Sequence, residues 1–158
     1  MVVTGWLLDT NILSELRRPK PERKVLAFVA AQPLDLLYVS TATLAEIRFG
    51  IERVSGASRR AELNDWLAHK ARPMFEEANV GWAKARSAVP THQRKLQAST
   101  WARFALPTLR PKACSPKLII AATALHHGLT VVSRDVRDYQ KARAPVFNPW
   151  VDPPPASP

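Results

Sequence analysis

The 158-residue sequence is poor in cysteine and has no long apolar run, and each of these absences excludes a class of protein. The single cysteine, Cys114, cannot form an intramolecular disulfide, which is typical of a protein that works in a reducing cytoplasm. No stretch approaches the roughly 18 consecutive apolar residues that a membrane span needs. The N-terminus has no basic region followed by an apolar core, so we expect no signal peptide, no membrane and a cytoplasmic location.

Two kinds of ligand site are also missing from the sequence. No group of Cys and His residues has the spacing of a zinc site, and His126 and His127 would point about 100° apart on a helix. No glycine-rich phosphate loop follows the first apolar stretch, which argues against a nucleotide-binding Rossmann enzyme.

Acidic residues are absent from residue 78 to residue 134, and this gap accounts for most of the net charge of +10. Nine Lys or Arg residues fall in the gap, and removing them from the 23 basic residues leaves 14 basic against 13 acidic residues elsewhere. A strongly basic third of the chain predicts a polyanionic partner.

Short apolar stretches alternate with helical patterns along most of the chain. Strand-like stretches run over residues 2–8, 36–40 and 129–133, and helical patterns cover 11–16, 22–31, 41–54, 59–71, 118–127 and 138–142. The helix at 118–127 has strong boundary signals, with Ser115 and Pro116 before it and Gly128 after it. Strands alternating with helices predict one α/β domain with a parallel sheet.

Three carboxylates are placed to meet at one edge of that sheet. Asp9 and Asp135 each follow a predicted strand, and Glu46 lies six residues beyond the end of a third strand. Ligands of open α/β sheets bind at the carboxyl ends of the strands. Three acids on one rim repel one another unless a cation neutralises them, and hard oxygen ligands favour Mg²⁺ or Mn²⁺. Such a site suits phosphodiester hydrolysis.

Each of these acids also has a structural alternative. Asp9 could cap the helix that follows it. Glu46 follows Thr43 at the spacing of a capping box. Asp135 could be an ordinary turn residue, and Asp138 could cap the next short helix.

Five motifs in sequence order resemble those of PIN-domain toxins of the VapC/FitB type. They are Leu7-Leu8-Asp9-Thr10-Asn11, Ala45-Glu46 with Arg48 and Gly50, Ile120-Ala121-Ala122-Thr123-Ala124, Leu129 to Asp135, and Val146-Phe147-Asn148-Pro149-Trp150. The resemblance covers residues 6 to about 75 and 115 to 151.

The resemblance implies a PIN-like three-layer α/β/α sandwich with a central, mainly parallel sheet. It also implies a Mg²⁺-dependent endoribonuclease toxin (Mn²⁺ could replace Mg²⁺), an RNA substrate, a cognate antitoxin and a homodimer. By position, Asp9, Glu46 and Asp135 match the acidic catalytic and metal-site residues, and Thr10 and Asn11 match the polar pair that would contact substrate. We expect a single domain over residues 1–151 and a disordered tail over 152–158.

Lys117 departs from the family pattern, in which the helix after Pro116 normally opens with an aspartate of the metal site. A cation in the first helical turn also faces the positive end of the helix dipole. Its ammonium could sit where the metal should bind, so we expect metal affinity and cleavage to suffer. The alternative function is a catalytically impaired PIN-fold protein that only binds its antitoxin or RNA.

Residues 76–117 form an atypical segment that could be poorly ordered. The segment lacks helical or strand periodicity, and Pro90, Pro107 and Pro111 interrupt it. We favour a shifted reading frame as the explanation, because helix signals, core signals and acids vanish together. The alternative is a basic RNA-binding insertion in which Trp82 or Trp101 stacks on bases.

Overall fold

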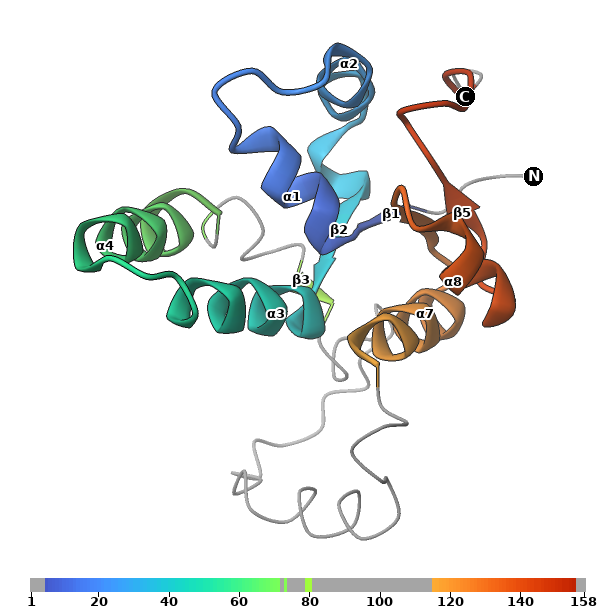
Figure 1. The fold of residues 1–158 in the computed structure, drawn as a ribbon. Helices are drawn as coiled ribbons and strands as arrows, with labels where there is room; N and C mark the ends of the chain where they lie inside the picture. Colours follow the sequence, from blue (N-terminus) through green and yellow to red (C-terminus); the bar gives the residue numbers. More distant parts are fainter. Residues whose placement is uncertain (1–4, 72, 74–78, 81–114, 156–158) are drawn as a thin grey trace, which may run out of the picture.

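A five-stranded, all-parallel sheet forms the centre of the protein in the computed structural model, which describes residues 5–71, 73, 79–80 and 115–155 (Figure 1). The strand order is β3-β2-β1-β4-β5, so the first strand of the chain lies in the middle. The strands are β1 (Trp6–Leu8), β2 (Leu37–Ser40), β3 (Asn79–Val80), β4 (Thr130–Val132) and β5 (Val146–Phe147). All four strand pairs are parallel, which confirms the predicted mainly parallel sheet.

Helices cover both faces of this sheet. Those described are α1 (Thr10–Leu16), α2 (Arg23–Ala31), α3 (Thr41–Glu52), α4 (Ala57–Trp66), α7 (Pro116–His127) and α8 (Val136–Lys141), with a 3₁₀ turn at Leu34–Leu36 and a π-helical turn at Leu67–Ala71. In Figure 1, α1 and α2 lie on one side of the strands, and α7 and α8 lie on the other. The predicted three-layer α/β/α sandwich is therefore confirmed.

The alternation of side chains in β1 builds the two cores. Leu7 points into a cluster with Ile120 of α7 and Tyr139 of α8. Trp6 and Leu8 point into the opposite cluster, which holds the apolar sides of α1, α2, α3 and α4. Because both faces of β1 are covered, its residues are apolar without interruption, as in a central parallel strand.

Helix α4 begins earlier than the predicted helical range of 59–71. It starts at Ala57, because Gly56 with φ 111° already redirects the chain. In α3, Phe49 is 64% exposed, whereas Ile51, 4% exposed, lies in the core. The earlier beginning of α4 does not move a strand end.

Parts of the expected domain organisation lie outside the described residues. Of the atypical segment at 76–117, the structure describes only β3 and residues 115–117. Of the expected tail, residues 156–158 are outside the description, and Asp152 accepts a hydrogen bond from the Asn148 amide. No helix within the described ranges has the length and hydropathy of a membrane span.

Candidate active site at the carboxyl ends of the strands

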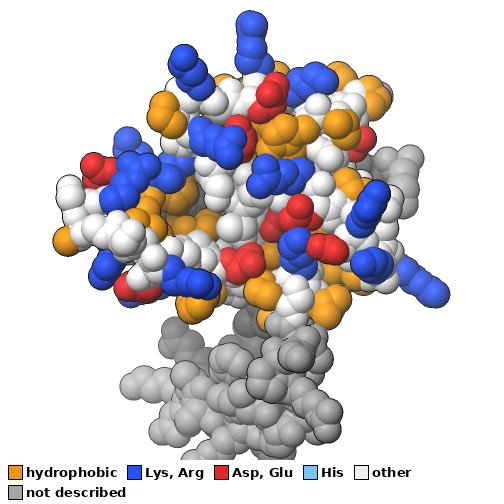
Figure 2. Space-filling model, viewed as in Figure 1, with side chains coloured by type: hydrophobic (Ala, Val, Ile, Leu, Met, Phe, Trp, Pro, Cys, Tyr) orange, Lys and Arg blue, Asp and Glu red, His pale blue; other side chains and the backbone are white. Residues whose placement is uncertain are grey.

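Acidic side chains gather where β1 and β4 end and α3 begins. Figure 2 shows this face, with acidic groups near the middle and Lys and Arg side chains around them. Strands β1 and β4 are adjacent and parallel, so the residues that follow them emerge at the same edge of the sheet. Asp9 follows β1 directly, Asp135 follows β4 after two residues, and Glu46 lies in the second turn of α3. The structure thus brings the three predicted acids to one rim.

Asp9 is the most buried of the three acids, with 3% of its surface exposed. Its Oδ1 accepts a hydrogen bond of 2.7 Å from the Thr10 amide. Its Oδ2 accepts bonds from the Ser133 hydroxyl at 2.6 Å and from the Asn11 side chain at 3.1 Å. Asp9 is also the N-cap residue of α1. The same side chain therefore both caps the helix and lies at the rim, so the two interpretations are compatible.

Glu46 is joined to the rim through Thr10, whose hydroxyl donates a 2.5 Å hydrogen bond to Glu46 Oε2. The capping-box alternative for Glu46 is wrong. The N-cap of α3 is Ser40, and its hydroxyl oxygen accepts the bond from the Thr43 amide at 3.0 Å. Glu46 is therefore left available to face the rim.

Asp135 is linked to Asp9 by two polar side chains, Asn11 and Ser133. The Ser133 hydroxyl accepts a bond from the Asp135 amide at 3.0 Å while donating to Asp9. The Asn11 amide nitrogen lies 2.9 Å from the Ser133 hydroxyl oxygen and 3.5 Å from Asp135 Oδ2. Its Oδ1 is buried without a hydrogen-bond partner in the structure.

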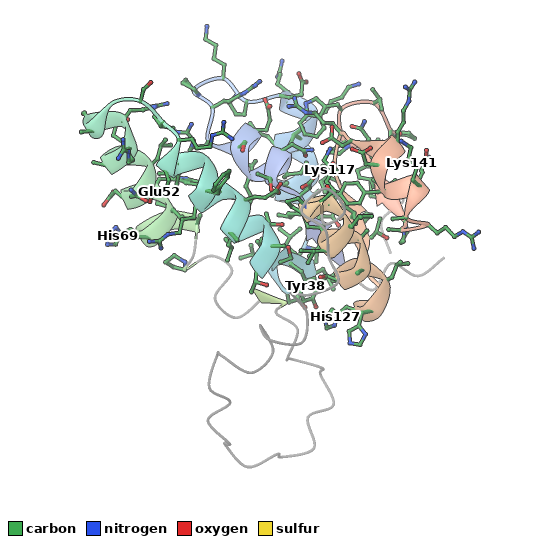
Figure 3. All side chains as sticks on the ribbon, turned by 60° about the horizontal axis from the view of Figure 1, so that its bottom comes forward. Tyr38, Glu52, His69, Lys117, His127 and Lys141 are labelled. Carbon is green, nitrogen blue, oxygen red and sulfur yellow. The ribbon has the colours of Figure 1, made fainter. Side chains whose placement is uncertain are left out.

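Lys117 lies between two acids at the beginning of α7. Figure 3 labels it at the end of that helix opposite His127. Its ammonium nitrogen is 2.8 Å from Asp135 Oδ2 and 2.7 Å from Asp138 Oδ2. Partial burial opposes the charged form, but hydrogen bonds and attraction from Asp135 and Asp138 exceed that effect and raise the pKa of Lys117 to about 12. The same contact lowers the pKa of Asp138. Lys117, the cation found where the family pattern has an acid, is therefore held by ion pairs to Asp135 and Asp138.

Sequence reasoning missed two groups that support the rim. Ser133 is fully buried, and the only signal for it was a small polar residue at a strand end. Tyr139 of α8 is also fully buried, and its hydroxyl faces Asp9 without a hydrogen bond of good geometry. Burial first, and then the charge of Asp9, raise the pKa of Tyr139 above its ordinary value. Its aromatic ring gave no sign of this placement.

A cavity of about 270 Å³ opens over the rim. Beside the acids and their polar neighbours, the lining includes two basic residues that the sequence did not single out, Arg18 and Arg134. Its lining residues are Asp9, Thr10, Asn11, Ser14, Glu15, Arg18, Glu46, Lys117, Arg134 and Asp135.

The carboxylates are hard oxygen donors of the kind that Mg²⁺ takes, but their arrangement does not fit a divalent cation. Within the described residues, no group of three or more His, Cys, Asp or Glu side chains is arranged to hold a metal ion. Both oxygens of Asp9 accept hydrogen bonds from uncharged donors, and Asp135 already pairs with the Lys117 ammonium. The positive charge beside Asp135 is thus supplied by the Lys117 ammonium.

Comparison with known proteins places these features in a family. Residues 6–110 match the PIN domain family. The chain is 32% identical over 154 residues to Toxin FitB of Neisseria gonorrhoeae, covering 92% of this chain and 99% of that protein. It is 34% identical over 152 residues to the VapC ribonuclease Y4jK of Sinorhizobium fredii, covering 91% and 96%. The crystal structure of FitAcB from Neisseria gonorrhoeae is similar at 30% identity and a TM-score of 0.69, covering 93% of this chain and 99% of that chain.

Proposed function

This chain belongs to the PIN-domain family, among relatives named as FitB and VapC toxins, and we propose that it is the ribonuclease toxin of a toxin–antitoxin pair. Its RNA substrate would be hydrolysed at the rim formed by Asp9, Glu46 and Asp135. We further propose that Lys117 holds this activity far below the level that a complete acidic site would give.

One hydrogen-bonded network supports the assignment of the rim. Thr10 joins Glu46 to the first turn of α1, while Asn11 and Ser133 join Asp9 to Asp135. The network joins groups of α1 and α3 with the residues that follow β1 and β4, across up to 124 residues of sequence. Buried polar groups held in such a network keep fixed positions, which a hydrolytic site requires.

Each side chain of the rim has a proposed role. In a complete site, Asp9, Glu46 and Asp135 would hold the divalent cation, and their carboxylates would orient the attacking water. Thr10 and Asn11 contact the substrate and keep the acids oriented, since each already donates a hydrogen bond to one of them. Tyr139 keeps water away from the inner side of Asp9, because its ring is fully buried there.

Mg²⁺, or Mn²⁺ in its place, is the proposed cofactor of a complete site, where it would activate water and neutralise the leaving oxygen. The wild-type arrangement works against this cofactor. The Lys117 ammonium lies 2.8 Å from Asp135 Oδ2, and two cations cannot share that oxygen without strong repulsion. We therefore propose weak metal binding and weak cleavage for the wild-type chain.

Substitution of Lys117 tests this proposal directly. We expect Lys117→Asp to gain Mg²⁺-dependent cleavage of single-stranded RNA by at least tenfold, and Lys117→Ala to gain less. Adding Asp9→Ala to Lys117→Asp should abolish the gain. Mg²⁺ should also raise the midpoint of thermal unfolding of Lys117→Asp but not that of the wild type, because a ligand stabilises the state that binds it.

Two outcomes would contradict the proposal in different ways. Robust cleavage by the wild type that Asp9→Ala leaves unchanged would remove the rim from the reaction. A Lys117→Asp variant that is folded yet shows neither a thermal shift with Mg²⁺ nor cleavage would show that Lys117 is not what limits metal binding.

A second candidate function is binding without catalysis. It is favoured by the double ion pair of Lys117, which neutralises part of the rim in the chain itself. Such a protein would bind its cognate antitoxin or RNA tightly and cleave nothing, and Lys117→Asp should then restore a response to the metal.

We also propose that the chain forms a homodimer, which sedimentation of the purified protein would test.

A further inference from the structure

We propose that Arg18 and Arg134 form a pair of phosphate-binding groups that hold single-stranded RNA across the acidic rim. The inference rests on the proposed function, since it names how the substrate of that same cavity is held. Both residues line the cavity over the rim, Arg18 two positions after the end of α1 and Arg134 directly before Asp135.

An acidic cavity needs cations before it can accept a nucleic acid. The lining contains the carboxylates Asp9, Glu15, Glu46 and Asp135, and a phosphodiester approaching them meets like charge. Lys117 relieves only part of this repulsion, because its ammonium is already shared between Asp135 and Asp138. The other basic groups of the lining are Arg18 and Arg134. Arginine also suits phosphate, since its planar fork can donate two parallel hydrogen bonds.

Arg18 is held at the cavity by a buried acid. Glu15 is 4% exposed, and its Oε2 lies 3.2 Å from Arg18 Nη1. Its other oxygen accepts a 3.0 Å bond from the Glu22 amide at the beginning of α2, so Glu15 cannot swing away. The Arg18 side chain remains 59% exposed and keeps donors free for a ligand, because a guanidinium has five N–H groups. The neighbouring Arg17 instead lies over the ring of Trp66 and is not part of the lining.

Arg134 is held on the other side of the cavity by an aromatic ring. Its guanidinium carbon is 5.9 Å from the centre of the Trp150 ring, within the range of a cation–π contact. Trp150 is fixed in turn, since its amide donates to Asn148 Oδ1 at 3.0 Å and its carbonyl accepts a bond from Lys24. Trp150, the last residue of the motif that begins at Val146, thus positions the Arg134 guanidinium beside the rim.

Binding of a short RNA tests the pair without any cleavage. The probe is a fluorescein-labelled single-stranded tetraribonucleotide, measured by anisotropy with EDTA present. We expect Arg134→Ala to weaken binding three- to tenfold. Because Arg18→Ala alone would strand the buried Glu15 charge, the second variant is Glu15→Gln with Arg18→Ala, which should weaken binding by a similar factor relative to Glu15→Gln alone. Glu15→Gln alone keeps an acceptor for the Glu22 amide and removes one carboxylate from the lining, so it should not weaken binding.

The matched control is Arg137→Ala, an exposed arginine on α8 that is not part of the cavity lining. It removes the same charge three residues from Arg134 and should change affinity less than twofold. The slope of log affinity against log salt should fall by about 0.7 for each lost phosphate contact in the test variants. Inorganic phosphate should compete with the probe on the wild type more strongly than on either test variant, Arg134→Ala or Glu15→Gln with Arg18→Ala.

Three outcomes would overturn the inference. Test variants that match Arg137→Ala in affinity and salt slope would show that RNA is held elsewhere, while RNA cleavage by Lys117→Asp could still support the proposed function. A wild type that fails to bind the probe would exclude the pair directly. Unchanged RNA binding with lost antitoxin binding would assign the two arginines to the protein partner instead.

Discussion

At the scale of single residues, Ser133 is the group on which the geometry of the rim most depends. Its hydroxyl donates to Asp9 and accepts from Asn11 and from the Asp135 amide, all within 3.0 Å. When this fully buried hydroxyl is removed, each of its three polar partners loses one hydrogen bond.

We therefore expect Ser133→Ala to lower the free energy of unfolding by about 1–3 kcal/mol. Urea denaturation measures this change. Ser14→Ala is the control, because Ser14 is exposed within α1 and alanine favours a helix, so its stability should stay equal or rise slightly. Equal effects of the two substitutions would contradict the central role of Ser133.

Lys117 shows at the same scale how much a sequence can and cannot reveal. Its place after Pro116 made it recognisable as a cation where an acid was expected. Its actual partners depend on the packing of α7 against α8, which the sequence does not encode in any local pattern. Asp138 was considered only as a cap, yet it is one of those two partners.

At the scale of elements, two glycines illustrate how backbone conformation decides the effect of the same substitution. Gly128 ends α7 in the left-handed region, with φ 65° and ψ 29°. Gly50 lies within α3, and a Cβ added to it would meet no atom within 4 Å. The first position needs glycine, and the second does not.

We expect Gly128→Ala to lower the free energy of unfolding by about 1 kcal/mol, because the left-handed region strains an L-residue. Gly50→Ala should raise it by about 0.5–1 kcal/mol through better helix propensity. Thermal unfolding of both variants checks the opposite signs. A stabilising Gly128→Ala would be incompatible with the observed helix end.

The helix boundaries were predictable where local signals were strong. Ser115, Pro116 and Gly128 set both ends of α7 as expected, because capping and the left-handed conformation act on a few residues only. The helical segment that begins with α4 ends at Ala71 as predicted, but the π-helical geometry of its last turn, Leu67–Ala71, is announced by no residue type. Helical spacing alone left open whether Phe49 or Ile51 faces the core, and the structure buries Ile51.

At the scale of the whole molecule, an aromatic cluster ties the two ends of the described chain together. Trp6 of β1 contacts Phe28 of α2 at 5.1 Å between ring centres and Phe147 of β5 at 5.5 Å. Phe28 and Phe147 are 4.8 Å apart. The cluster therefore joins the central strand, an edge strand and the helix that covers them.

We expect Phe28→Ala to lower the free energy of unfolding by about 3–5 kcal/mol, as loss of a buried aromatic ring usually does. Phe49→Ala removes the same side chain from an exposed position and should change it by less than about 0.5 kcal/mol. Chemical denaturation distinguishes the two. Similar losses would mean that Phe28 does not pack as the structure has it.

The layer arrangement was predictable because alternating strands and helices constrain topology strongly. That Asp9 and Asp135 emerge at one edge followed from parallel strands alone. Arg18 was not predictable, since its place at the cavity depends on Glu15 turning back to the beginning of α2. Residues 81–114 carry most of the excess positive charge and lie outside the described residues, so both explanations of that segment stay hypotheses.

The position of β1 in the middle of the sheet has a consequence for how the protein is made. Strand β1 pairs on one side with β2, but its other neighbour, β4, begins only at residue 130. Asp9 and Ser133 are 124 positions apart, and at about 5–20 residues per second this separation takes many seconds to translate. The carboxylate rim therefore cannot assemble until β4 and Asp135 have been synthesised, and a nascent chain ending before β4 lacks one wall of the site.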